Sequence, residues 1–246
     1  MTDELCIDTW KNSFGHRCKP GDWKDDCTDA RPRRVFVLLL NGRSVEHLEL
    51  VQREIKAMGA EAVLCPGDLA DPAIPQTIVE ETVRQLGGLD ILINNAGIGI
   101  PKPLMDTTTE EWDYHMAINA RAPFLLCREA VPHLRKSDGA TIINISSVVG
   151  RKGYVNQGAY SASKHALMGF TKVLAQELFE EDIRVYVLSP GGVATEMVTQ
   201  MRPDIDPDNL IDPEDFAEIV RFLLTHRNSA VIDEINVRRA SNSPWK

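Results

Sequence analysis

From Val35 onward, short apolar runs alternate with amphipathic stretches of helical spacing, and this alternation constrains the fold more than any other feature. The run Val35–Leu40 is continuously apolar, which is typical of a strand buried on both faces. Ser44 can cap the helix that follows, and Gly59 ends its apolar stripe. Strands alternating with helices in this way predict an α/β fold with a mostly parallel, doubly wound sheet and right-handed crossovers.

The same alternation continues along the rest of the chain. Further strands are expected at Ala62–Cys65, Leu89–Ile93, Thr141–Ile145, Ile183–Leu188 and Val231–Val237. Helical material is expected at Ile78–Leu86, at Trp112–Leu134 with a break near Pro123, at Tyr160–Leu178, and after Asp212, which precedes Pro213 at the first helical position. Ligands of such sheets bind beyond the carboxyl ends of the strands, so the residues that follow each strand are the candidates for a site.

Charge and hydropathy exclude several classes of protein. The net charge is −9, and the only dense basic run is Arg31–Arg34, so no nucleic-acid partner is expected. No apolar segment approaches the ~20 residues that span a bilayer, so no membrane partner is expected. The acidic start Met1–Trp10 lacks the features of a signal peptide, which leaves a cytoplasmic location as the expectation.

The five cysteines are irregularly spaced and odd in number, which fits neither a disulfide framework nor a zinc site. Cys18 and Cys27 have no paired cysteine or histidine at ligand spacing. No metal site is therefore expected.

Tyr160 and Lys164 form a plausible proton-transfer pair. They are four residues apart in an expected helix, so both side chains project from one face about one turn apart. A phenol ordinarily loses its proton near pH ~10, and a neighbouring ammonium favours the phenolate and lowers that pKa. Such a spacing also arises by chance, and a Tyr–Lys pair is more often simple surface packing.

Other polar residues follow the expected strands, and each has a simpler interpretation. Ser147 comes after Thr141–Ile145 and reads equally well as a cap or turn residue. The run Asn94–Gly97 follows Leu89–Ile93 and reads first as a turn. Asn119 lies within a helical stretch, where asparagine is mildly unfavourable, which indicates either a role or a solvent-facing side chain.

Taken together and in this order, the residues closely resemble the classical short-chain dehydrogenase/reductase superfamily. The order is strand–Asn-Asn-Ala-Gly, helical Asn, strand–Ser, Tyr-x-x-x-Lys and strand–Pro-Gly, and it covers the chain from about Val35. The resemblance implies a single domain with a Rossmann-type sheet over residues 35–246. It also implies an NAD(P)-dependent oxidoreductase that reduces a carbonyl or oxidises a secondary alcohol by hydride transfer.

The resemblance further implies roles for four residues. Tyr160 would be the general acid in reduction and the base in oxidation. Lys164 would hold the nicotinamide ribose and lower the pKa of Tyr160. Ser147 would hydrogen-bond the substrate carbonyl, and Asn119 would anchor a water that relays protons to Lys164.

The implied cofactor site lies at the ends of several strands. The expected cleft residues are Asn95, Ala96 and Gly97, with Asp68 and Leu69 beside the adenine and with Pro190, Gly191 and Thr195 on the nicotinamide side. Arg43 follows Val35–Leu40, where family members read the adenosine ribose, and no acid occupies Asn41–Ser44. An arginine there suits the additional phosphate of NADP, so NADP is expected rather than NAD, although Arg43 could equally be a solvated charge.

The N-terminal segment, residues 1–34, departs from the pattern. The family begins with a strand, a glycine-rich loop that binds pyrophosphate, and a helix, and none of these precedes Gly42. Read one nucleotide later, the codons allowed for His16–Lys24 permit Thr-Gly-Ala-Ser-Arg-Gly-Ile-Gly-Lys, which is the whole missing loop. In the same frame Asn12–Gly15 permits a strand, Thr-Val-Leu-Val, and Asp25–Arg34 permits an amphipathic helix.

We therefore hypothesise that residues from about Asn12 to about Val35 are a shifted-frame translation of the usual cofactor-binding start. The competing interpretation is that degenerate codons can spell many products. The literal chain is expected to bind cofactor weakly or not at all.

Substrate and assembly are less constrained. A 3-oxoacyl-thioester reductase is one possibility, but the ending Val231–Arg239 departs from many such reductases. A non-catalytic pseudoenzyme or binding module is the main alternative, and a sugar-nucleotide epimerase is disfavoured by the short chain. The resemblance suggests a homodimer or homotetramer built through Trp112–Leu134 and Tyr160–Leu178, acting on a small-molecule carbonyl or alcohol.

Overall fold

The structure is a computed structural model that describes Cys6–Ile7 and residues 37–244. The expectations for Arg31–Arg34, Cys18, Cys27 and the segment 8–36 lie outside the described residues. Within the described part of the chain, no helix is long and apolar enough to cross a membrane.

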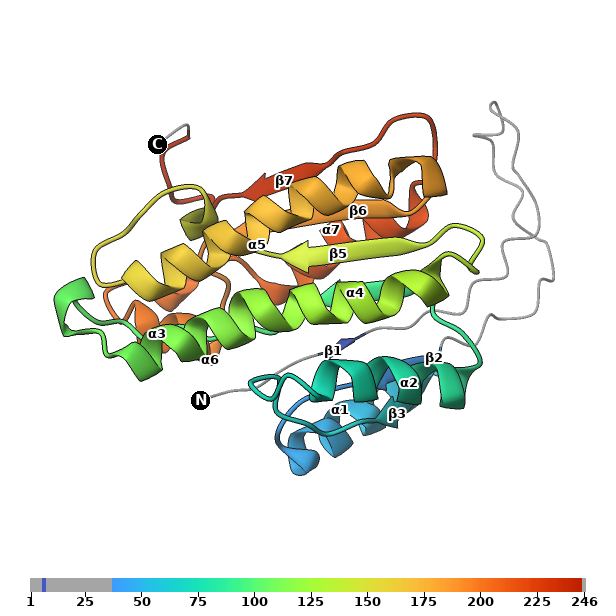
Figure 1. The fold of residues 1–246 in the computed structure, drawn as a ribbon. Coiled ribbons are helices and arrows are strands. Elements are labelled where there is room, and N and C mark those ends of the chain that lie inside the picture. Colours follow the sequence, from blue (N-terminus) through green and yellow to red (C-terminus); the bar gives the residue numbers. More distant parts are fainter. Residues whose placement is uncertain (1–5, 8–36, 245–246) are drawn as a thin grey trace.

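The strands form two sheets, one of β1 (Cys6–Ile7), β2 and β3 and one of β4 to β7, which Figure 1 shows in different parts of the molecule. The larger group is a parallel sheet in the order β4-β5-β6-β7, and β2 pairs in parallel with β3 in the smaller one. The parallel strands are β2 (Val37–Leu40), β3 (Glu61–Leu64), β4 (Ile91–Asn94), β5 (Thr141–Ile145), β6 (Arg184–Pro190) and β7 (Glu234–Val237). The predicted α/β class with a parallel sheet is confirmed.

Helices cover both faces of the sheet, as a doubly wound fold requires. Consecutive residues of a strand point to opposite faces, and Ile142 packs in one apolar core whereas Ile143 packs in another, against α7. In Figure 1, α4 and α5 lie together over one face and α7 lies behind β5 and β6. The helices are α1 (Val45–Ala57), α2 (Ile74–Leu86), α3 (Thr109–Met116), α4 (Ala122–Leu134), α5 (Gly158–Glu177), α6 (Glu196–Met201) and α7 (Pro213–Thr225).

The helix ends follow the signals in the sequence. The Ser44 hydroxyl accepts a hydrogen bond from the His47 N–H at 3.2 Å and caps α1. Gly59, just beyond α1, has φ of +86°, a left-handed conformation that glycine adopts without strain. Asp212 caps α7 by accepting from the Glu214 N–H at 2.9 Å.

The break expected near Pro123 lies earlier in the chain. Ala117–Arg121 forms a π-helical turn between α3 and α4, closed by a hydrogen bond from the Ala122 N–H to the Ala117 carbonyl. Pro123 itself lies in the first turn of α4, just after this π turn. The π turn buries Asn119 and aims its amide toward the site described below.

The two groups of strands are separated where a doubly wound sheet would have its centre. Here β1 (Cys6–Ile7) pairs antiparallel with β2, with Cys6 opposite Leu40, and lies beside β4. The described residues supply no parallel strand between β2 and β4. The first βα unit is therefore absent from the described part of the fold, as the sequence predicts.

Candidate active site

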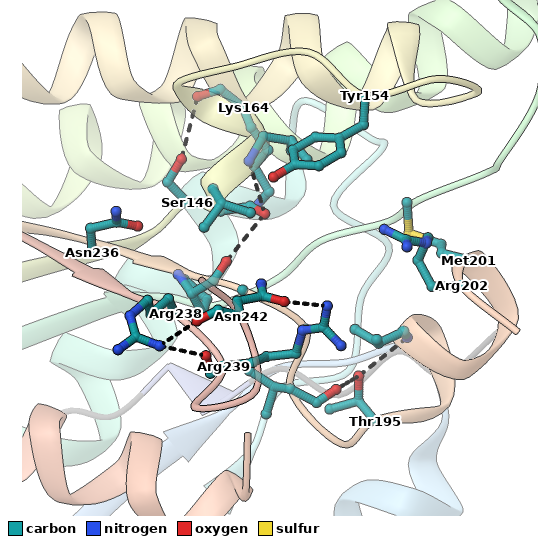
Figure 2. A pocket seen from close by; sticks show the side chains of 18 of the residues that line it. Ser146, Tyr154, Lys164, Thr195, Met201, Arg202, Asn236, Arg238, Arg239 and Asn242 are labelled. Carbon is teal, nitrogen blue, oxygen red and sulfur yellow. Dashed lines mark hydrogen bonds between the residues drawn. The ribbon is translucent and has the colours of Figure 1, made fainter. Parts of the chain in front are cut away.

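Strand β5 and helix α5 bring three of the predicted catalytic residues to one cavity. Ser147 follows β5 and begins a short 3-10 turn, Val148–Gly150. Tyr160 and Lys164 are one turn apart on α5, and all three side chains line a cavity of about 1490 Å³. Figure 2 shows Lys164 in this cavity. All are more than nine-tenths buried, so each interacts with the cavity in a low-dielectric setting.

Burial raises the pKa of the Tyr160 phenol, and the Ser147 hydroxyl, which favours the phenolate, opposes that rise. The burial comes from Val149 and Met201, which form an apolar cluster around the ring. The pKa of Tyr160 is therefore raised, whereas the sequence predicts that the neighbouring ammonium lowers it. The cause is tertiary packing, because Met201 comes from α6, far along the sequence.

Lys164 is held at the end of β5. Its Nζ donates to the Ile145 carbonyl at 2.8 Å, and burial lowers its pKa to about 8. A Cβ at Gly97 would lie 3.4 Å from this Nζ, so the missing side chain there keeps the ammonium open to the cleft. Lys164 therefore changes charge near neutral pH, as a proton-transfer group should.

Asn119 positions the loop that follows β4. Its Nδ2 donates to the Ile98 carbonyl at 2.9 Å and to Ser163 Oγ at 3.0 Å, and its Oδ1 accepts from the Ile98 N–H at 2.8 Å. The two bonds to Ile98 tie the loop containing Gly97 to the π turn, and the bond to Ser163 ties the π turn to α5. Asn119 does not line the cavity, so its contribution here is to fix the loop rather than to touch a ligand.

The predicted cofactor residues fall into two adjoining hollows that share Gly97. The large cavity is lined by Asn95, Gly97, Pro190, Gly191 and Thr195, together with the catalytic residues. The smaller hollow is lined by Arg43, Asp68, Leu69, Ala96 and Gly97. The predicted residues therefore lie along one cleft at the carboxyl ends of the parallel strands.

The two hollows differ in size, and the smaller one, at about 30 Å³, has room for little more than a water molecule. Arg43 Nη1 donates to the Tyr114 hydroxyl at 2.8 Å at the edge of this smaller hollow. At the centre of the cleft, between the two hollows, the described residues lack the groups that would bind a pyrophosphate. Asn41 Oδ1 and Asn94 Oδ1, at the ends of β2 and β4, are buried without a hydrogen-bond partner, and no described residue supplies the N–H groups that cradle a pyrophosphate.

The cavity also has walls that the sequence did not single out. They come from β7 and the segment after it, and from α6: Asn236, Arg238, Arg239, Asn242, Met197, Met201 and Arg202. The register pairs Pro190 with Val237, which places the residues after β7 beside Pro190–Gly191. The described residues contain no cluster of His, Cys, Asp and Glu that could hold a metal ion.

Known proteins share this architecture. Residues 33–206 match the short chain dehydrogenase family. An uncharacterized oxidoreductase of Thermotoga maritima is 39% identical, over 64% of this chain and 62% of its own length. A 3-oxoacyl-[acyl-carrier-protein] reductase of Staphylococcus aureus is 32% identical over 75% of this chain and 78% of that protein.

A solved structure extends the likeness to three dimensions. The crystal structure of a metagenomic short-chain oxidoreductase in complex with NADP superposes with a TM-score of 0.69. It is 34% identical, covering 82% of this chain and 85% of the other. The family match, the relatives and this superposition agree with one another. The chain belongs to the short chain dehydrogenase family of NAD(P)-dependent oxidoreductases.

Proposed function

We propose that this protein reduces a carbonyl group to a secondary alcohol, or runs the reverse oxidation, with Tyr160 as the proton donor or acceptor. The observation that carries the proposal is the meeting of buried Ser147, Tyr160 and Lys164 in one cavity. The reductase from Staphylococcus aureus, whose name specifies a 3-oxoacyl substrate, supports a carbonyl compound as the substrate class.

The residues present suit this chemistry. A reduced nicotinamide, when bound, supplies a hydride to the carbonyl carbon. Tyr160 Oη donates its proton to the carbonyl oxygen, which takes the electron pair of the broken π bond, and Ser147 Oγ donates a hydrogen bond to the same oxygen. The Lys164 ammonium stabilises the phenolate that remains. Because burial raises the pKa of Tyr160, the phenol holds its proton at neutral pH, which suits reduction.

The test is a pair of matched tyrosine variants, made in the chain whose residues 12–35 are read in the shifted frame, because the literal chain is expected to bind cofactor weakly or not at all. Tyr160→Phe keeps the ring but removes the proton, and kcat should fall by about 10²- to 10⁴-fold. Tyr154 lines the same cavity, and Tyr154→Phe should leave kcat within a small factor of the parent value. Turnover is followed by the absorbance of the reduced nicotinamide over a panel of carbonyl compounds. A Tyr160→Phe protein with parental kcat would disprove the assignment.

The same proposal includes a preference for NADP(H). Arg43 contributes a guanidinium to the hollow that would hold the adenosine end, and the metagenomic relative was crystallised with NADP. Arg43→Ala should lower kcat/KM for NADPH and leave that for NADH nearly unchanged. Tyr114→Phe is the control, since it removes the hydroxyl that Arg43 contacts but keeps the charge. An equal loss with both cofactors would refute the preference.

The proposal also divides the chain into an anomalous N-terminal segment, residues 1–34, and a catalytic domain, residues 35–246. It attributes the anomalous segment to a shifted reading frame in the gene. A shifted reading frame over residues 12–35 would restore a strand, a glycine loop and a helix in that order. Three observations support it: the family match begins only at residue 33, β2 and β4 lack a parallel strand between them, and two buried amide oxygens flank that place.

Sequencing the source DNA tests the frame directly. Codons that spell the glycine loop one nucleotide later would support the shifted-frame hypothesis, and codons that spell an unrelated product would refute it. Both chains should then be expressed and titrated with NADPH, followed by nucleotide fluorescence. The reframed chain should bind saturably and the literal chain weakly or not at all. Equal binding by the two chains would show that the glycine loop is dispensable.

The missing strand also favours a second candidate function, a non-catalytic binding protein with this fold. The two candidates differ in one observable. A pseudoenzyme would show no turnover even in the reframed chain, whereas the enzyme would regain it. The retention of Ser147, Tyr160 and Lys164 in one buried cluster favours the enzyme.

Self-association is the remaining expectation. Exposed apolar side chains lie on the two long helices, with Phe124 on α4 packed edge-on against Phe170 on α5, and Val173 also exposed on α5. We include in the proposal a homodimer or homotetramer joined through these helices. Light scattering on the parent and on Phe124→Ser should show a lower mass for the variant, and a monomeric parent would refute the assembly.

A further inference from the structure

The wall of the large cavity is strongly basic, although the chain as a whole is acidic. The chain carries 27 Lys and Arg against 36 Asp and Glu. The cavity is lined by six basic residues and, among the residues the structure describes, by no Asp or Glu. The six are Arg151, Lys152, Lys164, Arg202, Arg238 and Arg239. A cleft lined by one sign of charge concentrates ligands of the opposite sign, so an anion is favoured here.

Three of these six residues have a carboxylate or aromatic partner, and Lys164 belongs to the proposed proton-transfer pair. Arg151 pairs with Glu234 at 3.0 Å, and Arg202 pairs with Asp204 at 2.8 Å. Lys152 lies over a tyrosine ring at 5.8 Å. Their carboxylate and aromatic contacts leave the two arginines after β7 as the candidates for a ligand.

Arg238 and Arg239 differ in what they contact. Arg238 is exposed, and its Nη1 donates to the carbonyls of Arg239, Ala240 and Asn242, so it stabilises the turn that follows β7. Arg239 is partly buried, and its Nη2 donates to Asn242 Oδ1 at 2.9 Å (Figure 2). Arg202 and, to a smaller extent, Arg239 lower the pKa of Asp204, but that carboxylate is already paired with Arg202. Arg239 therefore has a neutral hydrogen-bond partner and a charge that is only partly balanced.

Arg239 also lies close to where the reaction would take place. A Cβ at Gly191 would come within 3.7 Å of Arg239 Cγ, and a Cβ at Gly192 within 3.7 Å of its Cδ. These glycines follow β6, on the nicotinamide side of the cleft, so the stem of Arg239 runs within van der Waals distance of this loop. The guanidinium is thus held on the same cavity wall as the site of hydride transfer.

We propose that Arg239 binds an anionic group of the substrate, so that the substrate is an oxo acid whose carboxylate or phosphate lies a few bonds from the carbonyl. This inference rests on the proposed function, which it deepens by naming the substrate class. The same anion chemistry could come from a phosphate of the cofactor, and the experiment separates these two sources.

The experiment compares acids with their neutral esters. Pyruvate, acetoacetate and levulinate place the carboxylate at increasing distances from the ketone, and each is paired with its ethyl ester. Binding is measured by saturation-transfer NMR on the literal chain, and turnover by nicotinamide absorbance on the reframed chain. The parent should prefer at least one acid over its ester, and Arg239→Gln should lose that preference. Loss of one charge-assisted contact lowers affinity by on the order of 10- to 100-fold.

Arg84→Gln is the matched control, because it removes the same charge from an exposed position on α2 that does not line the cavity, and it should keep the preference for the acid. A parent that binds every acid and ester equally would overturn the proposal. So would an Arg239→Gln protein whose KM for NADPH rises equally with acids and esters, since that result assigns Arg239 to a cofactor phosphate. Binding of an acid that depends on Arg239 without turnover of any carbonyl would support the anion site while contradicting the proposed reaction.

Discussion

Replacing Lys164 by methionine should stabilise the fold at neutral pH while abolishing the activity. The pKa of Lys164 falls from 10.5 to about 8 because the ammonium is buried. At ~1.4 kcal/mol per pKa unit, keeping the charged form in the folded state costs ~3 kcal/mol at pH 7. Methionine has a similar length and no charge, so that cost disappears.

The gain is reduced by one lost contact. Lys164 Nζ donates to the Ile145 carbonyl at 2.8 Å, and losing this hydrogen bond costs ~1 kcal/mol. The net expectation is a free energy of unfolding higher by ~2 kcal/mol at pH 7, equivalent to a Tm increase of ~4–8 °C for a chain of this size.

The sign of the pH dependence follows from linkage. Between pH 8 and 10.5 the unfolded chain binds more protons at Lys164 than the folded chain does, so parental stability rises with pH across that interval. Above it the burial cost has vanished and only the hydrogen bond distinguishes the two proteins. Lys164→Met should then be less stable than the parent by ~1 kcal/mol.

Urea unfolding of both proteins at pH 7 and pH 10.5 measures the difference. Lys172 is exposed on the same helix, so Lys172→Met is the matched control for replacing a lysine of α5 that is not buried. If Lys164→Met is less stable than the parent at both pH values, or if the difference between them does not depend on pH, then the burial argument is wrong.

Three further predictions follow from contacts in the structure. Asn119→Ala leaves the N–H and carbonyl of Ile98 without their side-chain partner, so unfolding free energy should fall by ~2 kcal/mol, and an unchanged urea midpoint would refute the positioning role. In the reframed chain, the Gly97→Val side chain would push against Lys164 Nζ and Asn119 Oδ1. A fluorescence titration should then show a Kd for NADPH that is higher by tenfold or more, which corresponds to a loss of ~1.4 kcal/mol. Tight binding of NADPH by the variant would contradict the placement of Gly97 in the cofactor cleft. Arg227 Nη1 donates to Gly139 O, Ala140 O and Thr141 Oγ1, far from the cavity, so Arg227→Ala should lower Tm without changing kcat, and a loss of kcat at full stability would count against this purely structural role.

The site could be anticipated from the sequence because its order is local. Tyr160 and Lys164 share one helix, so their spacing alone sets their relative positions. Ser147 and the residues after Asn94 each follow a strand, and parallel strands bring their carboxyl ends to one edge. These relations need only the pattern of elements and not the detailed packing.

Other properties depend on packing between distant segments, which the sequence pattern does not contain. The pKa of Tyr160 rises because Met201 and Val149 close over the ring, and neither contact follows from the spacing of Tyr160 and Lys164. Arg239 reaches the cavity because β7 pairs with β6 in one particular register. The π turn at Ala117–Arg121 had no signal beyond the unfavourable Asn119.

The proposed catalytic residues and the expected pyrophosphate site lie on different parts of the sheet. Damage to the N-terminal segment can therefore affect one without the other. Strands β5, β6 and β7 carry Ser147, the Gly191 loop and Arg239, and α5 packs on them without help from the first βα unit. The pyrophosphate would lie where β2 and β4 are not joined by a parallel strand, beside the unpartnered amide oxygens. A damaged start should therefore weaken NADPH binding far more than binding of an oxo acid. If the literal chain binds an acid through Arg239 but not NADPH, the defect is confined to the cofactor-binding start; if it binds neither, the cavity itself depends on the missing strand.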